Sequence, residues 1–244
     1  MIITAKMKMA DVIIQNHHLL SVINRFGIQL GFGEKSVDSV CKMHEINTDF
    51  FLDMINSFND PDFFPKQKFK SYPLSLIVDY LYKTHDFYIN VKVPEINSLI
   101  EQLQQSSTGK TAKAVLLIHK FFNEYASQLK SHITFEEENV YPYIKELETV
   151  YNENNSETIK EFMLNNEFII KDYATQHDNI EEKLYDIKNL IIKYISPKEN
   201  FSLCFKILGQ IAHLEEDIKD HSEMENKIIV PQVAIMEQNL QTLN

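Results

Sequence analysis

The most constraining feature of this chain is a succession of four long segments with helical periodicity after Pro73. In each segment, apolar residues recur at the three- and four-residue spacing that gives an α-helix one hydrophobic face. The segments span residues 73–105, 111–148, 157–194 and 200–240. Helices of this length exceed the usual mean of about 11–12 residues, and helical bundles accommodate them.

Short polar breaks separate the four segments. They fall at residues 106–109, 152–156 and 196–198, and they are rich in Ser, Asn, Gly or Pro. Consecutive helices joined by such short connections should be antiparallel neighbours. We therefore expect an all-α fold, with an up-down-up-down four-helix bundle over residues 73–244.

A small helical module is expected over residues 1–57. Three of the five glycines of the chain occur between residues 25 and 33, which indicates a sharp turn of the backbone there. Ser36 and either Asn47 or Thr48 are candidate N-caps of two short helices. Residues 58–72 contain the helix breakers Asn-Asp-Pro and Phe-Pro, so we expect them to form a linker.

Composition excludes several classes of partner. The formal net charge is −11, and the densest basic stretch is residues 66–70. Because an acidic surface repels phosphate groups, neither nucleic acid nor an anionic membrane is an expected partner. No apolar run approaches the roughly 18 residues of a membrane span.

Cysteine usage and the first residues favour a cytoplasmic protein. Cys41 and Cys204 are the only cysteines, too few for a disulfide framework or a cysteine-rich zinc site. The segment that follows Met1 lacks the apolar region of a signal peptide.

Two His-x-x-x-Glu pairs lie mid-way along the second and fourth segments. They are His132 with Glu136, and His221 with Glu225. On a helix, positions i and i+4 share one face and lie about 6 Å apart along the axis. Each imidazole can therefore converge on one point with its carboxylate.

Two further histidines, His85 and His177, lie mid-way along the first and third segments. Each of the four histidines falls on an apolar stripe, and α-helical spacing places Tyr125, Leu129 and Tyr143 on the stripe of His132. The histidines and the two glutamates should thus face the bundle interior. A buried carboxylate is costly unless a positive charge neutralises it, which predicts a bound cation.

The spacing of these residues also indicates an internal duplication. His85 and His132 are 47 residues apart, and His177 and His221 are 44 apart. Helical bundles use inward-facing histidine and carboxylate sets to hold two iron or manganese ions, and nitrogen and oxygen donors also suit zinc. The predicted metal ligands are His85, His132, Glu136, His177, His221 and Glu225.

The prediction depends on the whole set, because a lone histidine on an apolar stripe is more often a hydrogen-bonded core residue than a ligand. Glu137 and Glu138 follow Glu136 and are expected on a solvated face. The remaining histidines lie off the stripes, lack a carboxylate partner or fit a packing role, and we assign no metal to them: His17, His18, His44, His119 and His213.

Residues 132–142 read His-Ile-Thr-Phe-Glu-Glu-Glu-Asn-Val-Tyr-Pro. This stretch resembles the signature H-x-x-K-E-E-x-x-L-F-P of the di-iron proteins that repair iron–sulfur clusters, the YtfE/ScdA-type (RIC) branch of the hemerythrin-like proteins. Residues 221–231 are similar to the second signature of that family, H-x-x-L-E-N-x-I-L-F-P. Shorter similarities cover residues 82–94, 176–178 and 26–41.

The resemblance implies a non-haem centre of two oxo-bridged iron ions in a four-helix bundle. By motif position, the six residues of the predicted set are the ligands, and Glu136 and Glu225 are the bridges. The family restores iron–sulfur clusters damaged by nitric oxide or oxidative stress, plausibly by donating iron. The implied partners are damaged iron–sulfur proteins, which are bound transiently, and small diatomic molecules, NO and O₂.

The chain departs from the family in its N-terminal module. Gly31 and Phe32 replace the tandem cysteines, Gln29 replaces an aspartate, and Cys41 alone remains. This departure argues against a thiol-based role for the module. Phe135 also replaces the lysine of the first signature, at a position that is not a ligand.

Three other functions remain open at this point. One is a hemerythrin-like carrier or sensor of oxygen or nitric oxide, although oxygen-carrying hemerythrins typically use five histidines and two carboxylates. Another is an enzyme that reduces nitric oxide at the centre, and the last is a metal-free helical interaction protein. We assign no catalytic residue. The sequence is compatible with a homodimer but gives no interface for one.

Overall fold

The computed structural model describes residues 1–60, 62–166, 170, 173, 180–195 and 200–242. Within these residues, helices are the only regular elements apart from one isolated β-bridge between Lys8 and Ser36. The expectation of an all-α fold is confirmed. The chain divides into two compact units, residues 1–84 and 85–244, and the boundary falls within helix α6 (Leu74–Phe87).

The described residues of the first unit form five short helices and the first turns of α6. They are α1 (Met9–Gln15), α2 (Leu19–Arg25), α3 (Val37–Met43), α4 (Thr48–Asn59) and α5 (Lys66–Phe69). Both predicted caps are present: the Ser36 side chain accepts the N–H of Ser39, and the Asn47 side chain accepts the N–H of Phe50. Such caps satisfy N–H groups that have no partner inside the helix.

The glycine-rich turn joins α2 to α3. Gly27, Gly31 and Gly33 have φ angles of 70°, 98° and 58°. L-residues with a side chain rarely adopt this left-handed backbone, so the turn accounts for three of the few glycines in the chain. Cys41 is fully buried beyond this turn, in the core that α3 shares with α1, α2 and α4.

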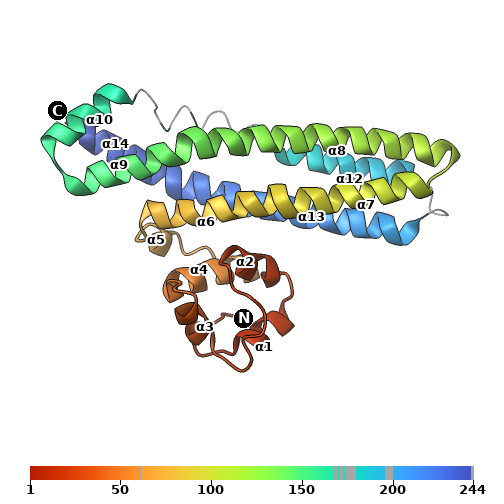
Figure 1. The fold of residues 1–244 in the computed structure, drawn as a ribbon, viewed down its shortest axis with the longest axis horizontal. Coiled ribbons are helices and arrows are strands. Elements are labelled where there is room, and N and C mark those ends of the chain that lie inside the picture. The colour runs from red at the N-terminus through yellow and green to blue at the C-terminus, as the bar shows by residue number, and fades with distance from the viewer. Residues whose placement is uncertain (61, 167–169, 171–172, 174–179, 196–199, 243–244) are drawn as a thin grey trace. The chain divides into compact units, whose positions relative to one another are not determined.

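The second unit is a helical bundle (Figure 1). In this unit α7 packs on α8, α8 on α12, α12 on α13, and α13 on α7, so the four helices close into a ring around an apolar core. The described elements that follow α6 are η1 (Tyr88–Lys92), α7 (Val93–Ser106), α8 (Gly109–Phe135), η2 (Glu136–Val140), α9 (Tyr141–Glu153), α10 (Ser156–Asn165), α12 (Ile180–Tyr194), α13 (Phe201–Met224), η3 (Glu225–Ile229) and α14 (Val230–Thr242).

The elements agree with the predicted segments. The first, second and fourth segments each form one continuous helical run, and the breaks at 106–109 and 152–156 coincide with helix ends. The third segment begins as α10 and ends as α12, while 167–169, 171–172 and 174–179 lie outside the described residues. None of the helices in the described ranges is long and apolar enough to cross a membrane.

In the described residues, three π-helical turns interrupt the long helices, and a proline follows soon after each turn. In each turn, the residue before a proline donates its N–H to the carbonyl five positions earlier. The pairs are Val93 to Tyr88, Tyr141 to Glu136, and Val230 to Glu225. The following residues, Pro94, Pro142 and Pro231, have no N–H to continue the α-helical pattern. Such turns are frequent at functional sites.

Candidate metal centre

Imidazole and carboxylate groups converge in the interior of the second unit. His85 from α6, Glu136 from η2 and His221 from α13 are all buried, and each offers a ligand atom within 4.8 Å of the other two. Glu225, the first residue of η3, is buried beside them. Four helical elements thus direct chemically similar groups to one place.

The contacts among these groups are short. The Nε2 atom of His85 lies 3.2 Å from Nε2 of His221 and 3.3 Å from Oε2 of Glu136. The Nε2 atom of His221 lies 3.4 Å from Oε1 of Glu225. On the other side of Glu136, its Oε1 atom lies 3.0 Å from Nε2 of His132, whose side chain is 21% exposed. Both predicted i,i+4 pairs are therefore in contact.

Five of the six predicted ligands are in this cluster. The sixth, His177, lies outside the described residues, so its position in the bundle remains a prediction. His119 lies apart from the cluster: its ring nitrogens are 2.8 Å from Oε1 of Gln104 and 3.1 Å from Oδ1 of Asn97.

The cluster has the chemical character of a cation site. Two ring nitrogens face each other at 3.2 Å, and a hydrogen bond between them needs a proton on only one. The Oε2 atom of Glu136 is buried and, among the described residues, accepts no hydrogen bond. Because converging lone pairs in a dry interior are costly, a cation that binds them would lower the free energy of the folded protein. Nitrogen and oxygen donors of this kind suit iron, manganese or zinc.

Electrostatics favour the charged forms of the cluster. Burial by itself lowers the pKa of His85, but contacts with Glu136 and Glu137 raise that pKa to about 9. Burial likewise raises the pKa of Glu136, but His132 and His85 hold it well below its ordinary value. Glu136 is thus a carboxylate at neutral pH, and the positive charge beside it comes from protons that a metal ion would replace.

Glu137 also belongs to the centre, although the sequence pattern did not indicate it. Oε1 of Glu137 lies 3.1 Å from Nδ1 of His85, the ring nitrogen that does not face His221. The expectation of a purely solvated Glu137 was therefore wrong, because η2 turns this residue toward α6, whereas Glu138 is exposed as expected. A carboxylate in this place fixes the orientation of the imidazole and increases its basicity.

Two tyrosine hydroxyls also reach the cluster. Tyr141 donates to Oε1 of Glu225 at 3.0 Å, and its oxygen lies 3.3 Å from Nε2 of His85. Tyr173 donates to Oε1 of Glu136 at 2.5 Å. Burial, together with the charges of the two glutamates, raises the pKa of both phenols well above its ordinary value. Both hydroxyls are therefore hydrogen-bond donors toward the carboxylates.

The contact of Tyr141 with the centre was not predicted, because it depends on the π-helical turn η2. Regular α-helical spacing places Tyr143 on the His132 stripe; Tyr143 is buried, and its hydroxyl donates to Glu237 at 2.7 Å. In a regular α-helix, a residue five positions further on is rotated about the axis by about 140° beyond a full turn. The π-helical hydrogen bond from the N–H of residue 141 to the carbonyl of residue 136 removes most of this rotation, so the two residues lie on one face. The sequence feature that could have indicated this turn is Pro142, because proline has no N–H to continue regular α-helical hydrogen bonding.

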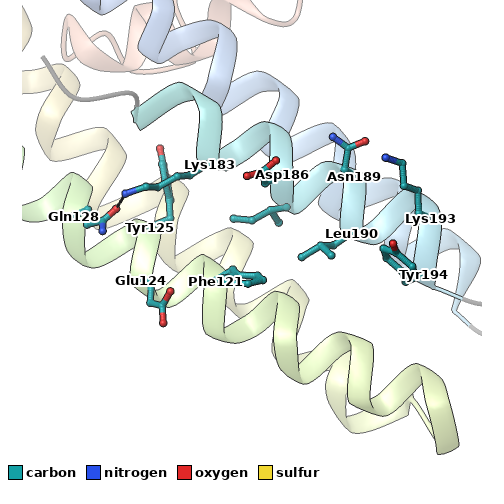
Figure 2. A pocket seen from close by; sticks show the side chains of 11 residues that line it. Phe121, Glu124, Tyr125, Gln128, Lys183, Asp186, Asn189, Leu190, Lys193 and Tyr194 are labelled. Atoms are coloured by element: carbon teal, nitrogen blue, oxygen red, sulfur yellow. Dashed lines mark hydrogen bonds between the residues drawn. The ribbon is translucent and has the colours of Figure 1, made fainter.

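A separate pocket of about 520 Å³ lies between α8 and α12 (Figure 2). Phe121 and Tyr125 of α8 line it together with Asp186 and Leu190 of α12. None of the five clustered residues lines this pocket. The candidate centre is therefore the buried cluster.

Comparison with known proteins agrees with this geometry. The family model described as "Hemerythrin HHE cation binding domain" matches residues 95–233, which is more than half of the chain. The matched range contains five of the six predicted ligands, and His85 precedes it. Comparisons with curated proteins and with solved structures gave no match. With its helical bundle and buried histidine–glutamate cluster, the chain belongs to the hemerythrin family of HHE cation-binding domains.

Proposed function

We propose that the protein binds two oxo-bridged iron ions through His85, His132, Glu136, His177, His221 and Glu225. One observation carries this proposal: Glu136 presents Oε2 to His85 and Oε1 to His132, at 3.3 Å and 3.0 Å. A carboxylate whose two oxygens face different histidines is arranged as a bridge between two ions. Glu225, the corresponding residue of the second pair, is the other bridge.

We further propose that the centre supplies iron to iron–sulfur proteins damaged by nitric oxide or oxidative stress, in the cytoplasm and through transient complexes. The motif resemblance in residues 132–142 and 221–231 supports this role. The bound iron would supply labile metal for the damaged cluster. His132 is the most exposed side chain of the described cluster, so its side of the centre is the natural exit for a metal ion.

The residues of the chain have separate roles in this proposal. The glutamates neutralise the charge of the ions, and the hydroxyl of Tyr173 holds the carboxylate of Glu136 in place. The apolar core of the bundle excludes water from the donors. Glu137 holds the imidazole of His85 through Nδ1.

The test has two stages. Purified protein should contain about two irons per chain and show near-ultraviolet absorption of an oxo bridge. The iron-loaded protein should then reactivate a dehydratase whose iron–sulfur cluster has lost iron, whereas iron-loaded Glu136→Leu, Glu225→Leu or the metal-free protein should not. Reversible dioxygen binding without reactivation would instead identify an oxygen carrier or sensor.

A further inference from the structure

The side chain of Tyr141 lies among the donor atoms of the cluster. The residue is fully buried, and its ring stacks on the imidazole of His85, with ring centroids 5.3 Å apart and planes inclined by 12°. Its hydroxyl oxygen contacts both a predicted nitrogen ligand and a predicted oxygen ligand. Stacking on His85 and the two hydroxyl contacts therefore fix the position of the phenol within the centre.

The donor atoms form a closed circuit that includes this oxygen. The circuit runs through Nε2 of His85, Nε2 of His221, Oε1 of Glu225 and Oη of Tyr141, and its successive sides are 3.2, 3.4, 3.0 and 3.3 Å. Neighbouring ligand atoms around one octahedral ion, with bonds of about 2.1 Å, lie about 3.0 Å apart. The four sides fit the edges of one coordination polyhedron.

We propose that Tyr141 is a seventh protein ligand. Its phenolic oxygen binds the metal ion that His85 and His221 hold. This inference rests on the proposed metal centre. On binding, the O–H bond of Tyr141 breaks and an oxygen–metal bond forms. The proton leaves to bulk base, together with the protons displaced from the histidines.

The local sequence explains why this oxygen is available. The π-helical turn η2, which ends before Pro142, brings residue 141 above Glu136 and into the interior. The signature that residues 132–142 resemble has phenylalanine at this position, and this chain has Tyr141 there.

A phenolate ligand would make the two metal positions unequal. The ion beside Tyr141 gains a negatively charged oxygen donor, which favours ferric iron and fills a coordination position. The ion beside His132 keeps the more open position. Iron should therefore leave to a chelator in two phases, with the faster phase from the His132 side.

The decisive experiment is spectroscopic. The protein is loaded anaerobically with ferrous iron and then oxidised in air. We expect a visible charge-transfer band from ferric iron to phenolate, with phenolate ring vibrations in the resonance Raman spectrum excited in that band. Both features should vanish in Tyr141→Phe, while the variant retains about two irons per chain.

A matched variant serves as the control. Tyr88 is equally buried, but its hydroxyl donates to the backbone carbonyl of Asp217 at 2.9 Å, so Tyr88→Phe should keep the band.

The outcomes separate this proposal from the metal site itself. Bound iron with oxo-bridge absorption but no phenolate vibrations in the unmodified protein would overturn the Tyr141 ligand and leave the metal site intact. A band that persists in Tyr141→Phe would do the same. The Raman spectrum of the unmodified protein tests the phenolate ligand directly. The test is therefore valid even if the Tyr141→Phe variant folds poorly. A protein that binds no iron would overturn both proposals.

Discussion

Tyr141 donates its backbone N–H to the carbonyl of Glu136, and this five-residue hydrogen bond aligns the two side chains on one face of the helix. The same arrangement links Val230 to Glu225 in the second half of the bundle, but there the aligned side chain is aliphatic. The turns η2 and η3 thus share the backbone geometry and differ in chemistry: of the two, only η2 aligns a hydroxyl with its glutamate.

Replacement of the bridging carboxylates should remove iron. We expect Glu136→Leu and Glu225→Leu to lower iron affinity by more than the roughly 10–100-fold that loss of a supporting residue costs. The reason is that each carboxylate contacts a histidine of the cluster and balances the charge of the ions. Iron content after gel filtration measures the effect. Glu138→Leu, at an exposed neighbouring position, is the control, and equal iron in all three variants would refute the ligand assignment.

Glu137→Gln should weaken iron binding without affecting folding. Oε1 of Glu137 lies 3.1 Å from Nδ1 of His85, and the amide carries no charge to support that imidazole. We expect a loss of about 10–100-fold in metal affinity, measured by competition with a chelator, and an unfolding midpoint close to that of the unmodified protein. Glu138→Gln provides the matched comparison. Unchanged affinity in Glu137→Gln would mean that the contact does not orient His85.

Local sequence signals predicted the helices well. The apolar periodicity and the polar breaks act within a few residues, so helix ends such as Ser106 and Gly109 were predictable, as were the caps Ser36 and Asn47. The i,i+4 pairs were predictable for the same reason. Their geometry depends on one helix, not on the packing of four.

The rest of the centre depends on irregular backbone and on contacts between helices. Tyr141 was missed because a π-helical turn shifts the helical phase by one residue. Tyr173 was missed because its hydrogen bond to Glu136 joins segments that are distant in the sequence. No periodicity within one segment specifies such a contact.

Tyr173→Phe should destabilise the metal-free protein. The change leaves a buried carboxylate oxygen of Glu136 without its 2.5 Å hydroxyl donor. Loss of a hydrogen bond to a buried charged group costs about 1.5–3 kcal/mol, and each kcal/mol lowers the unfolding midpoint of a domain of this size by about 2–4 °C. Thermal unfolding of both proteins after exhaustive chelation measures the difference. Identical midpoints would show that water or another group replaces the hydroxyl.

Native Cys41 should resist alkylation. The pKa of its thiol is raised to about 11, mainly because the residue is buried. At pH 8, only about one molecule in a thousand therefore carries the reactive thiolate. Iodoacetamide labelling followed by mass spectrometry should therefore modify Cys41 only after denaturation. Cys204, which is also buried with a raised pKa, should behave in the same way. Rapid labelling of Cys41 in the folded protein would restore a thiol-based role for the first unit.

Iron binding should protect the second unit of the chain from hydrogen exchange and leave the first unchanged. All the described donor atoms belong to residues 85–244, so the metal adds binding free energy to the folding of that unit alone. At free iron concentrations about 100-fold above Kd, the added stability is about 2.7 kcal/mol, or roughly 100-fold slower exchange where amides exchange through global unfolding of the unit. Anaerobic exchange with mass spectrometry should find this protection in α8, η2, α13 and η3, but not in α1–α4. Equal protection of α1–α4 would contradict the assignment of the iron to the second unit, because a ligand stabilises only the segments whose unfolding releases it.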